Sequence, residues 1–553
     1  MKNLFKYISK KECKFVLMVG FILVIITSSS LIYGYLIKPA DKFFPGIHSM
    51  AAGDFSVYYS YIGQAKEGHL IFQDLFTSES HSPFIFNPFW LIIGFLARVF
   101  NLSSIAAYQI SRILLIFLFV FVLYFFISYF FKKVKSRKYG FIFSIMASGL
   151  GGYFMPLIRN LFNNQITLKN YPMDLWVSEG YNFLTLYHSP HFIMATILII
   201  STLFLAYYSF IKNKWIYLLV AGFLANSLMF FHPFHLPTIL AVLLIYIFVK
   251  SFRDWQIKWD YIKKYLVYLF LIIPPVLYHF MILIYNPVAI DRASSNVCLT
   301  PYFWVVIISY GFLTPFALWG VIKKIKNEKF VFLITWLIVQ SALIFAPLGF
   351  QRRLTQGLQI PLSLMAFVGL VSLYHYLNKK FNLSKIFYAP VVLMLSILFF
   401  GFSNLYVLAE DFYFYSDPQF KEPPEYMYLD KEYKNTFNWL KEKMSDQDVI
   451  FGDHVPSHFI SGFALKKTYL SHWVETINFW AKREKMQKFW QENTSDDWRR
   501  EFIKEININY IFFSPFEKRH GKYNPDQSEL FKLVFTKGEV KIFKPNFDLP
   551  LKD

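Results

Sequence analysis

Long apolar segments alternate with short basic segments through the first 409 residues of the chain. Each apolar segment is about as long as a bilayer requires of a spanning helix, roughly 20 residues. None alternates apolar and polar positions with a period of two, so helices rather than outer-membrane strands are expected. The pattern predicts about eleven spans, at 15–37, 105–131, 139–157, 191–211, 215–231, 236–250, 265–285, 303–322, 330–349, 358–378 and 386–409.

The basic residues between these segments all fall on one side of the membrane if residues 84–101 lie in the interface and do not cross. In that arrangement the N-terminus and inner loops hold 24 Lys and Arg residues, and the outer loops before residue 410 hold 9. The positive-inside rule favours this arrangement, with the N-terminus in the cytoplasm and the C-terminus outside. Two long outer loops result, at 38–104 and 158–190.

The first apolar segment has a basic approach and is too long for a cleaved signal peptide, which favours a retained signal anchor. Cys13 and Cys298 fall on opposite sides of the membrane in this topology, so no disulfide is expected. The predicted location is a bacterial inner membrane, which the chain crosses several times.

The net charge of +20 over 553 residues raises the possibility of nucleic-acid binding. Residues 1–409 hold 34 Lys and Arg against 12 Asp and Glu, whereas residues 410–553 hold 22 against 24. The basic excess therefore lies between membrane spans, where it orients the chain. The tail offers no basic face to a phosphate backbone, so nucleic-acid binding is not expected.

The tail 410–553 predicts a separate α/β domain on the outer side, after a mainly helical membrane domain at 1–409. Apolar runs bounded by turn residues predict strands, and amphipathic stretches predict helices. The expected helices are at 431–445, 475–492 and 497–506, and the expected strands are at 448–452, 467–471 and 509–514, with a hairpin at 531–543 turning at Lys537-Gly538.

Carboxylates beside a membrane are costly unless they are hydrated, paired or used in chemistry. Among these acids, Asp54 in the first outer loop is the strongest candidate for a functional residue, since it follows Gly53 and precedes an aromatic, helix-like stretch. The alternative is an ordinary helix N-cap, which is a common role for Asp at such a position.

The second outer loop contains Asp174 and Glu179, five residues apart, and ends at Pro190-His191. Carboxylates of this kind could bind a divalent cation such as Mg or Mn, or act on a lipid phosphate through it. A solvated loop is the alternative. His232 and His235 lie in a four-residue hairpin on the same side and could face a substrate cavity or form a tight turn.

Arg352 and Arg353 lie at the outer end of a predicted span, against the trend of the other basic residues. A guanidinium group matches phosphate oxygens with two parallel hydrogen bonds, so a lipid phosphate is a natural partner. Snorkelling to phospholipid headgroups is the alternative.

At this point the chain resembles the GT-C superfamily, which are membrane glycosyltransferases that use polyprenyl-phosphate-linked donors. Protein O-mannosyltransferases, aminoarabinose transferases and the catalytic subunits of oligosaccharyltransferases belong to it. The stretches that carry the resemblance are Asp54…Tyr61…Gln64…Glu67-Gly68, Asp174…Glu179…Phe183…Pro190-His191, His232-Pro233, Arg352-Arg353…Pro361 and Ser471-His472…Glu475-Thr476.

The resemblance implies roles for these residues. Asp54 corresponds to the family's first-loop acid and would act as a general base or orient the acceptor, with Asp174 and Glu179 as the second-loop acids. Arg352 or Arg353 would bind the lipid phosphate. His191, His232, His235, His472 and Glu475 are expected to contact substrate or a glycan, lipid or protein acceptor. The second loop has Asp174-x4-Glu179 where many members have Asp-x-Asp, which leaves metal dependence open.

Other function classes remain. A lipid flippase or transporter would place ionisable residues along a path through the spans, and Arg112 is the clearest deeply placed charge. No internal repeat typical of transporters is found. A polysaccharide polymerase or ligase, and a non-catalytic GT-C scaffold, are the further alternatives.

Overall fold

The computed structural model describes residues 8–381, 398–417 and 427–546. The chain divides into two compact units: the first contains residues 1–29, 111–279 and 297–410, and the second contains residues 30–110, 280–296 and 411–553. The tail therefore belongs to one unit with residues 30–110, which include the predicted first outer loop, and with a short segment before Cys298. The assignment of residues 1–409 to a membrane domain and of residues 410–553 to a soluble outer domain stays a prediction.

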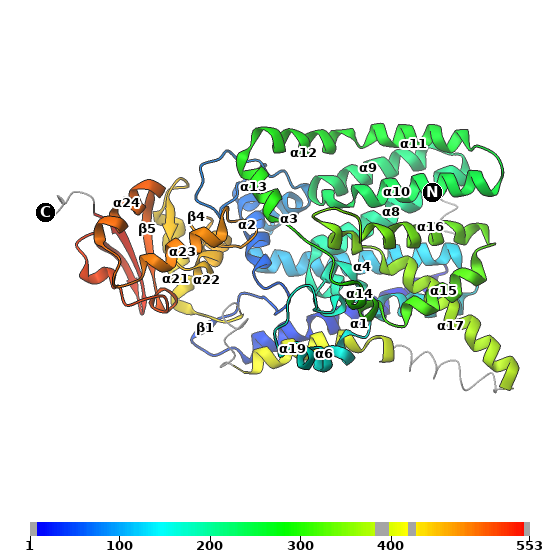
Figure 1. Cartoon of the computed structure of the whole chain (residues 1–553), viewed down its shortest axis with the longest axis horizontal. Coiled ribbons are helices and arrows are strands. Elements are labelled where there is room, and N and C mark those ends of the chain that lie inside the picture. Colours follow the sequence, from blue (N-terminus) through cyan, green and yellow to red (C-terminus); the bar gives the residue numbers. More distant parts are fainter. Residues whose placement is uncertain (1–7, 382–397, 418–426, 547–553) are drawn as a thin grey trace. The chain divides into compact units, whose positions relative to one another are not determined.

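The first unit is built of helices (Figure 1). Helices α1 (Lys10–Ile37), α4 (Ser104–Phe130), α12 (Ile273–Tyr285) and α19 (Phe402–Ser416) contribute residues to both units. The helices that lie within the first unit are α5 (Val134–Met146), α6 (Gly151–Leu161), α7 (Asn182–His188), α8 (Pro190–Lys212), α9 (Trp215–Phe231), α10 (Leu236–Arg253), α11 (Trp259–Leu271), α14 (Phe303–Tyr310), α15 (Leu313–Lys324), α16 (Glu328–Leu343) and α17 (Gln359–Phe381).

The predicted fold class, a mainly helical membrane protein with a C-terminal α/β region, is confirmed. Six helical segments of the described residues are long and apolar enough to cross a membrane, or eight if each of two bent helix pairs is one span. These eight coincide with eight of the predicted spans. Spans 215–231 and 330–349 coincide with shorter helices, α9 and α16, of 17 and 16 residues. The last predicted span, 386–409, begins outside the described residues.

Close backbone contact holds α15 against α17 (Figure 1). A Cβ atom added to Gly320 would lie 2.0 Å from the carbonyl oxygen of Met365, and one added to Gly369 would lie 2.0 Å from that of Phe316. Membrane helices gain attraction from such close approach, because lipid tails compete with any apolar side chain but not with tight packing. Glycine at both positions is therefore required by this crossing.

The segment whose crossing was uncertain, 84–101, forms the short helix α3 (Pro88–Val99) of 12 residues. A helix of that length spans about 18 Å, well short of a hydrocarbon core of about 30 Å. Asn87 caps its N-terminus by accepting a hydrogen bond from the Trp90 backbone N–H at 3.2 Å. The helix packs against α2 (Asp54–Glu67) in the second unit.

The second unit also contains a five-stranded mixed sheet with the strand order β4-β3-β5-β7-β6 (Figure 1). Strands β3 (Val449–Phe451), β4 (Lys467–Thr468) and β5 (Ile508–Phe513) are parallel, and β7 (Val540–Pro545) runs antiparallel to β5 and to β6 (Phe531–Lys537). Helix α21 (Lys431–Lys443) precedes β3, and helices α22 (His454–Phe459), α23 (Phe479–Phe489) and α24 (Asp496–Ile506) lie between β3, β4 and β5. The predicted strands and the hairpin at 531–543 are confirmed.

One expected helix begins later than predicted. Residues 475–492 were expected to be helical, but α23 begins at Phe479. Asn478 has a φ of 52°, in the left-handed region, so the chain turns there before the helix starts. The Thr476 hydroxyl also donates to the Phe76 carbonyl oxygen at 2.6 Å, which holds the preceding residues in a loop.

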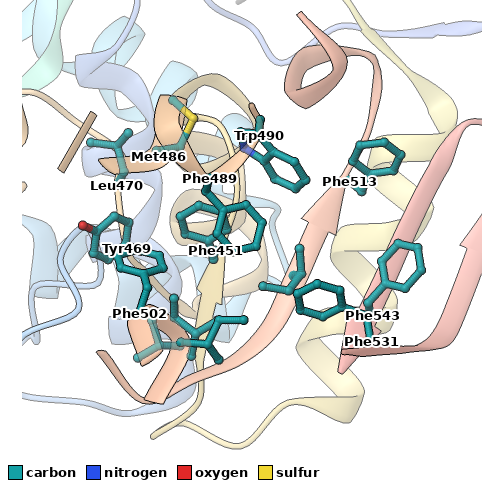
Figure 2. Close-up of a cluster of buried hydrophobic side chains, with 14 of the residues drawn as sticks. Phe451, Tyr469, Leu470, Met486, Phe489, Trp490, Phe502, Phe513, Phe531 and Phe543 are labelled. Atoms are coloured by element: carbon teal, nitrogen blue, oxygen red, sulfur yellow. The ribbon is translucent and has the colours of Figure 1, made fainter. Parts of the chain in front are cut away.

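Aromatic side chains fill the core on one side of the sheet (Figure 2). Phe451 from β3 contacts Phe489 and Trp490 at ring-centroid distances of 4.6 and 5.8 Å. Buried aromatic residues each remove a large apolar area from water, which gives this small sheet its stability. The core fixes the ends of the strands and thus the loops that follow them.

Candidate functional site

Asp54 is the first residue of α2 and is not its N-cap. The N-cap position is Gly53, which has no side chain to cap the helix. The Asp54 side chain is 37% exposed, so its carboxylate is reachable from solvent. Asp54 thus occupies the first helical position, and its carboxylate engages a residue from the tail.

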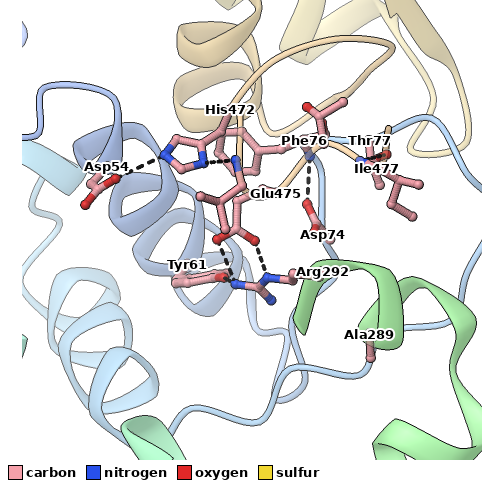
Figure 3. A network of polar contacts seen from close by, with 12 residues as sticks. Asp54, Tyr61, Asp74, Phe76, Thr77, Ala289, Arg292, His472, Glu475 and Ile477 are labelled. Carbon is pink, nitrogen blue, oxygen red and sulfur yellow. Dashed lines mark hydrogen bonds and ion pairs between the residues drawn. The ribbon is translucent and has the colours of Figure 1, made fainter. Parts of the chain in front are cut away.

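That residue is His472, whose Nε2 lies 3.0 Å from Oδ1 of Asp54 (Figure 3). The backbone N–H of Val474 donates to Nδ1 of the same ring at 3.2 Å. A neutral imidazole has one donor and one acceptor nitrogen. Because Nδ1 accepts, Nε2 carries the hydrogen and donates it to the Asp54 carboxylate. The sequence predicted both residues as site residues but not their contact.

A second imidazole, His458 on α22, lies beside this pair, with ring centroids of His458 and His472 5.4 Å apart. Its Nδ1 donates to the His454 carbonyl oxygen at 2.7 Å, which leaves Nε2 as an acceptor. Burial lowers the pKa of His458 well below its usual value, so this ring is neutral. Sequence reasoning missed His458; the His454-x3-His458 spacing directly after a predicted strand was the available signal.

Gly53 allows α2 to approach the two imidazoles. A Cβ atom at this position would lie 3.3 Å from Nε2 of His458 and 3.5 Å from Cδ2 of His472. The backbone of Gly53 has an ordinary helical φ of −64°, so the requirement for glycine here is one of space. The first turn of α2 thus places Asp54 against the tail loop.

Glu475 forms a second contact of the same tail loop, with Arg292 on α13 (Pro287–Ser295) (Figure 3). Arg292 Nη2 donates to Oε1 of Glu475 at 2.9 Å and to the Tyr61 hydroxyl at 2.8 Å, and its Nε contacts the other carboxylate oxygen. Two parallel bonds of this kind are the strongest arrangement for an arginine and a carboxylate. Arg292 was not predicted, because no local pattern distinguishes it from other loop arginines.

Asp74 lies close to this ion pair. One oxygen accepts a hydrogen bond from the Phe76 backbone N–H at 3.0 Å, and the other has no hydrogen-bond partner among the described residues. Burial, reinforced by the charge of Glu475, raises the pKa of Asp74 to about 7. The Asp74 carboxyl is therefore protonated at a higher pH than an exposed aspartate.

In the first unit, Asp174 is fully buried in the 3-10 turn Met173–Leu175. Its Oδ2 accepts hydrogen bonds from the Gly151 backbone N–H at 2.9 Å and the Ser403 hydroxyl at 2.6 Å. Gly151 begins α6, so the carboxyl group satisfies a donor at a helix N-terminus. Burial raises the pKa of Asp174 to about 7. These contacts stabilise the break between α5 and α6.

Glu179, the other acid of the second loop, lies near Arg352. It belongs to no group of metal-ligand side chains among the described residues. Arg352 Nε is 3.9 Å from Oε1 of Glu179, which is an ion pair but longer than a hydrogen bond. The guanidinium of Arg352 lies over the Trp176 ring at 4.4 Å. Its Nε is buried without a hydrogen-bond partner in the described structure. A donor in that state is the kind that an anionic oxygen would satisfy.

The remaining predicted residues of the first unit form a histidine cluster next to Arg353. The rings of His232 and His235 stack at 4.8 Å, and the ring of His191 lies 5.8 Å from that of His232. His235 Nε2 donates to the Gln356 side-chain oxygen at 2.8 Å. The Arg353 guanidinium lies over the Phe234 ring at 4.8 Å. The structure thus brings His191, His232 and His235 together and places each of them in buried surroundings.

The structure offers little to a metal ion. Among the described residues, no three His, Cys, Asp or Glu side chains lie close enough together to hold one. Asp174 is engaged by a helix N-terminus and a hydroxyl, and Glu179 faces a guanidinium. These residues do not fit the divalent-cation site considered from the sequence, and no step proposed below involves a metal.

Arg112, the charge that favoured a transporter, is anchored to its neighbours. Its guanidinium donates to the Thr27 carbonyl and hydroxyl oxygens at 3.3 and 3.1 Å, to the Ser28 hydroxyl at 2.9 Å and to the Leu186 carbonyl at 3.1 Å. Buried charges in membrane helices are tolerated when they are bonded in this way. The residue ties α1, α4 and α7 together, so it does not argue for a transport path.

No protein-family model matches the sequence, and no curated protein does either. Among solved structures, the chain is similar to the Archaeoglobus fulgidus oligosaccharyltransferase tethered to an acceptor peptide containing the NVT sequon. The TM-score is 0.52 at 12% identity, over 97% of this chain and 75% of that chain.

Two further structures from the same organism are similar over most of their length. The oligosaccharyltransferase with Zn and sulfate has a TM-score of 0.48 at 10% identity, over 96% of this chain and 74% of that chain. The oligosaccharyltransferase AglB with an inhibitory peptide and a dolichol-phosphate has a TM-score of 0.46 at 14% identity, over 91% and 70%. At these identities the likeness to the first of the three structures shows the fold alone, and it agrees with the predicted fold class.

Proposed function

We propose that this chain is a membrane glycosyltransferase that moves a sugar from a polyprenyl-phosphate-linked donor to an extracytoplasmic glycan, lipid or protein acceptor. The observation that carries the proposal is the exposed Asp54 carboxylate, held by a buried histidine in a chain with the GT-C fold. The archaeal oligosaccharyltransferase of similar fold holds an acceptor peptide in its crystal structure. That observation supports an acceptor-modifying reaction here.

In the proposed reaction Asp54 acts as the general base. The acceptor nucleophile attacks the anomeric carbon of the donor sugar as its proton passes to the Asp54 carboxylate. The bond between the anomeric carbon and the phosphate oxygen breaks, and its electron pair leaves with the polyprenyl phosphate. A positioned base of this kind contributes about 10² to 10⁴ in rate. Attack from the face opposite the phosphate inverts the configuration at the anomeric carbon.

The departing phosphate needs a cation, and Arg352 is our candidate. Its Nε is buried without a hydrogen-bond partner in the described residues, and Trp176 and Glu179 hold the guanidinium in place. Donors aimed at developing charge stabilise the transition state more than the substrate. Arg353 and the cluster of His191, His232 and His235 are proposed to contact the same lipid-linked donor.

We propose that the two acids of the second loop have structural and positioning roles. Asp174 supports the break between α5 and α6, and Glu179 orients Arg352, as their contacts favour. His472 and Glu475 belong to the acceptor side. The protein would lie in a bacterial inner membrane, with the N-terminus in the cytoplasm and the tail outside, as the distribution of basic residues predicts.

The test is transfer of labelled sugar from polyprenyl-phosphate donors by the purified protein in liposomes. Asp54→Asn is expected to lower kcat by about 10² to 10⁴ while the KM for the donor changes little. Asp41→Asn is the matched control, because Asp41 is an exposed acid of the same outer loop. Turnover that Asp54→Asn abolishes and Asp41→Asn preserves supports the proposal.

Other outcomes contradict it. Full activity in Asp54→Asn would remove Asp54 as the base. Absence of turnover with every donor, in protein that keeps its thermal unfolding transition, would favour a scaffold or a flippase. A fluorescent-lipid translocation assay in the same liposomes separates these two, since only a flippase moves the lipid between leaflets.

A further inference from the structure

We infer that His472 is a positioning residue for the Asp54 carboxylate, acting through its Nε2 hydrogen bond and not by contact with the acceptor. This inference rests on the proposed function and deepens it. The sequence placed His472 among the residues that contact an acceptor, and the geometry points to a different role.

The tautomer of the ring is fixed by its backbone contact. Val474 N–H donates to Nδ1 at 3.2 Å, and Nε2 lies 3.0 Å from Asp54 Oδ1. Only the neutral ring with hydrogen on Nε2 satisfies both contacts. In this state the ring has no lone pair left to accept a proton from a substrate. His472 therefore donates to the base and does not replace it.

Burial separates the roles of the two side chains. The His472 side chain is 5% exposed and the Asp54 side chain is 37% exposed. The Phe76 ring covers His472 edge-on at a centroid distance of 6.4 Å. A molecule arriving from solvent therefore meets the carboxylate and not the imidazole.

Contacts of the residues before and after His472 fix the backbone of its loop. The Ser471 backbone N–H donates to the Thr476 hydroxyl at 3.0 Å, and that hydroxyl donates to the Phe76 carbonyl oxygen at 2.6 Å. Glu475 is paired with Arg292 in the same loop. Because these contacts fix the backbone, Nε2 is held in place and restricts the rotation of the Asp54 carboxylate about its terminal bond. A reacting oxygen displaced by about 1 Å can cost about 100-fold in rate.

Glutamine offers a conservative test, because its amide nitrogen lies the same number of bonds from Cα as Nε2 of histidine. His472→Gln keeps a donor toward Asp54, whereas His472→Phe keeps the ring volume and removes the donor. We expect His472→Phe to lower kcat by about 10- to 100-fold, with the KM for acceptor and for donor within about twofold of wild type. We expect His472→Gln to recover most of that loss. His69→Gln, an exposed histidine of the same unit, is the control.

Two kinetic results would overturn the inference. A rise in the acceptor KM with unchanged kcat in His472→Phe would mean that His472 touches the acceptor. Equal loss in His472→Gln and His472→Phe would mean that the donor to Asp54 does not matter.

A measurement without turnover separates failure of this inference from failure of the proposed function. In the full chain with ¹⁵N-labelled histidine, the His472 signals are assigned as those that His472→Gln removes. We expect a protonated Nε2, an unprotonated Nδ1 and a shifted Nε2 signal in Asp54→Asn. An unprotonated Nε2, or signals insensitive to Asp54→Asn, would overturn the inference even in an active enzyme. The expected signals in a chain that shows no transfer would support the contact and reject only the proposed reaction.

Discussion

Arg292 and Glu475 are 183 positions apart in the sequence and form a two-armed ion pair, with Nη2 of the arginine 2.9 Å from Oε1 of the carboxylate. The contact joins α13 to the loop that carries His472. The Tyr61 hydroxyl accepts a further hydrogen bond from the same guanidinium. Apolar packing supports the join, since Val288 and Ala289 belong to one buried cluster with Phe84 and Ile477.

Removing one partner of this pair is expected to destabilise the protein more than removing both. Arg292→Met leaves the largely buried Glu475 carboxylate unpaired, and Glu475→Gln leaves the arginine unpaired. Each single variant is expected to cost about 2 to 3 kcal/mol, below the usual range for fully buried pairs because Arg292 is partly exposed. The double variant is expected to cost less than either single variant, because it leaves no unpaired charge. Thermal unfolding of the four proteins in detergent measures the coupling, and strictly additive effects would contradict it.

Asp174→Asn is expected to change how stability depends on pH. The pKa of Asp174 is raised by burial to about 7 in the folded protein, whereas an unfolded Asp titrates near its usual value. The folded state therefore binds more protons between these two values, so the free energy of unfolding falls as pH rises from about 4 to about 7. Asparagine removes this titration, and its carbonyl oxygen can accept the same hydrogen bonds from Gly151 and Ser403.

The measurement compares unfolding temperatures at pH 5 and pH 8. We expect the variant to gain about 2 to 4 °C relative to wild type on going from the lower to the higher pH. Asp260→Asn is the control, because Asp260 is exposed. An equal difference between variant and wild type at both values of pH would show that Asp174 does not titrate in this window.

Gly53→Ala is expected to impair transfer without unfolding the protein. The added methyl group would lie 3.3 Å from His458 Nε2, so that imidazole, which packs beside His472, must shift by a few tenths of an ångström. A loss of kcat of about 3- to 10-fold is expected from that displacement. Gly349→Ala is the matched control, since a Cβ atom there has no neighbour within 4 Å. Equal activity in both variants would mean that the approach of α2 to the imidazoles tolerates this shift.

Arg352 is expected to act on the donor. Arg352→Lys keeps the charge but loses the planar fork and the contact over the Trp176 ring. We expect a loss of about 10-fold or more in kcat/KM for the donor, with the acceptor KM little changed, and a larger loss in Arg352→Ala. Arg159→Ala, which changes an exposed arginine in the last turn of α6, is the control. A change confined to the acceptor KM would place Arg352 on the acceptor side.

The spans and the strands of the tail were predictable because each depends on its own stretch of sequence. The length of an apolar run decides whether it can cross a bilayer, and a helix of that length satisfies its own backbone. The hairpin turning at Lys537-Gly538 was predictable for a similar reason, since Gly538 has a φ of 55° that favours glycine. The later start of α23 could not be predicted from its own stretch of sequence, because a hydrogen bond from Thr476 to the distant residue Phe76 holds the preceding loop.

The site was predictable in its residues but not in its contacts. Residue type and the predicted side of the membrane singled out Asp54 and Arg352, and the family resemblance pointed to His472. Asp54 and His472 are nevertheless 418 positions apart. Whether a carboxylate caps its own helix or meets an imidazole from the tail depends on which segments the fold brings together. His458 and Arg292 were missed for the same reason.

The sequence by itself determined the class of this protein: a helical chain with several apolar spans, basic segments between them and an α/β tail. Hydrophobic length and charge asymmetry are local properties, and the bilayer selects on them directly. Only the tertiary structure decided that His472 donates to Asp54, that Glu475 pairs with Arg292 and that Asp174 supports a broken helix. Hydrogen bonds and ion pairs act over a few ångströms, so they exist only after distant segments have packed.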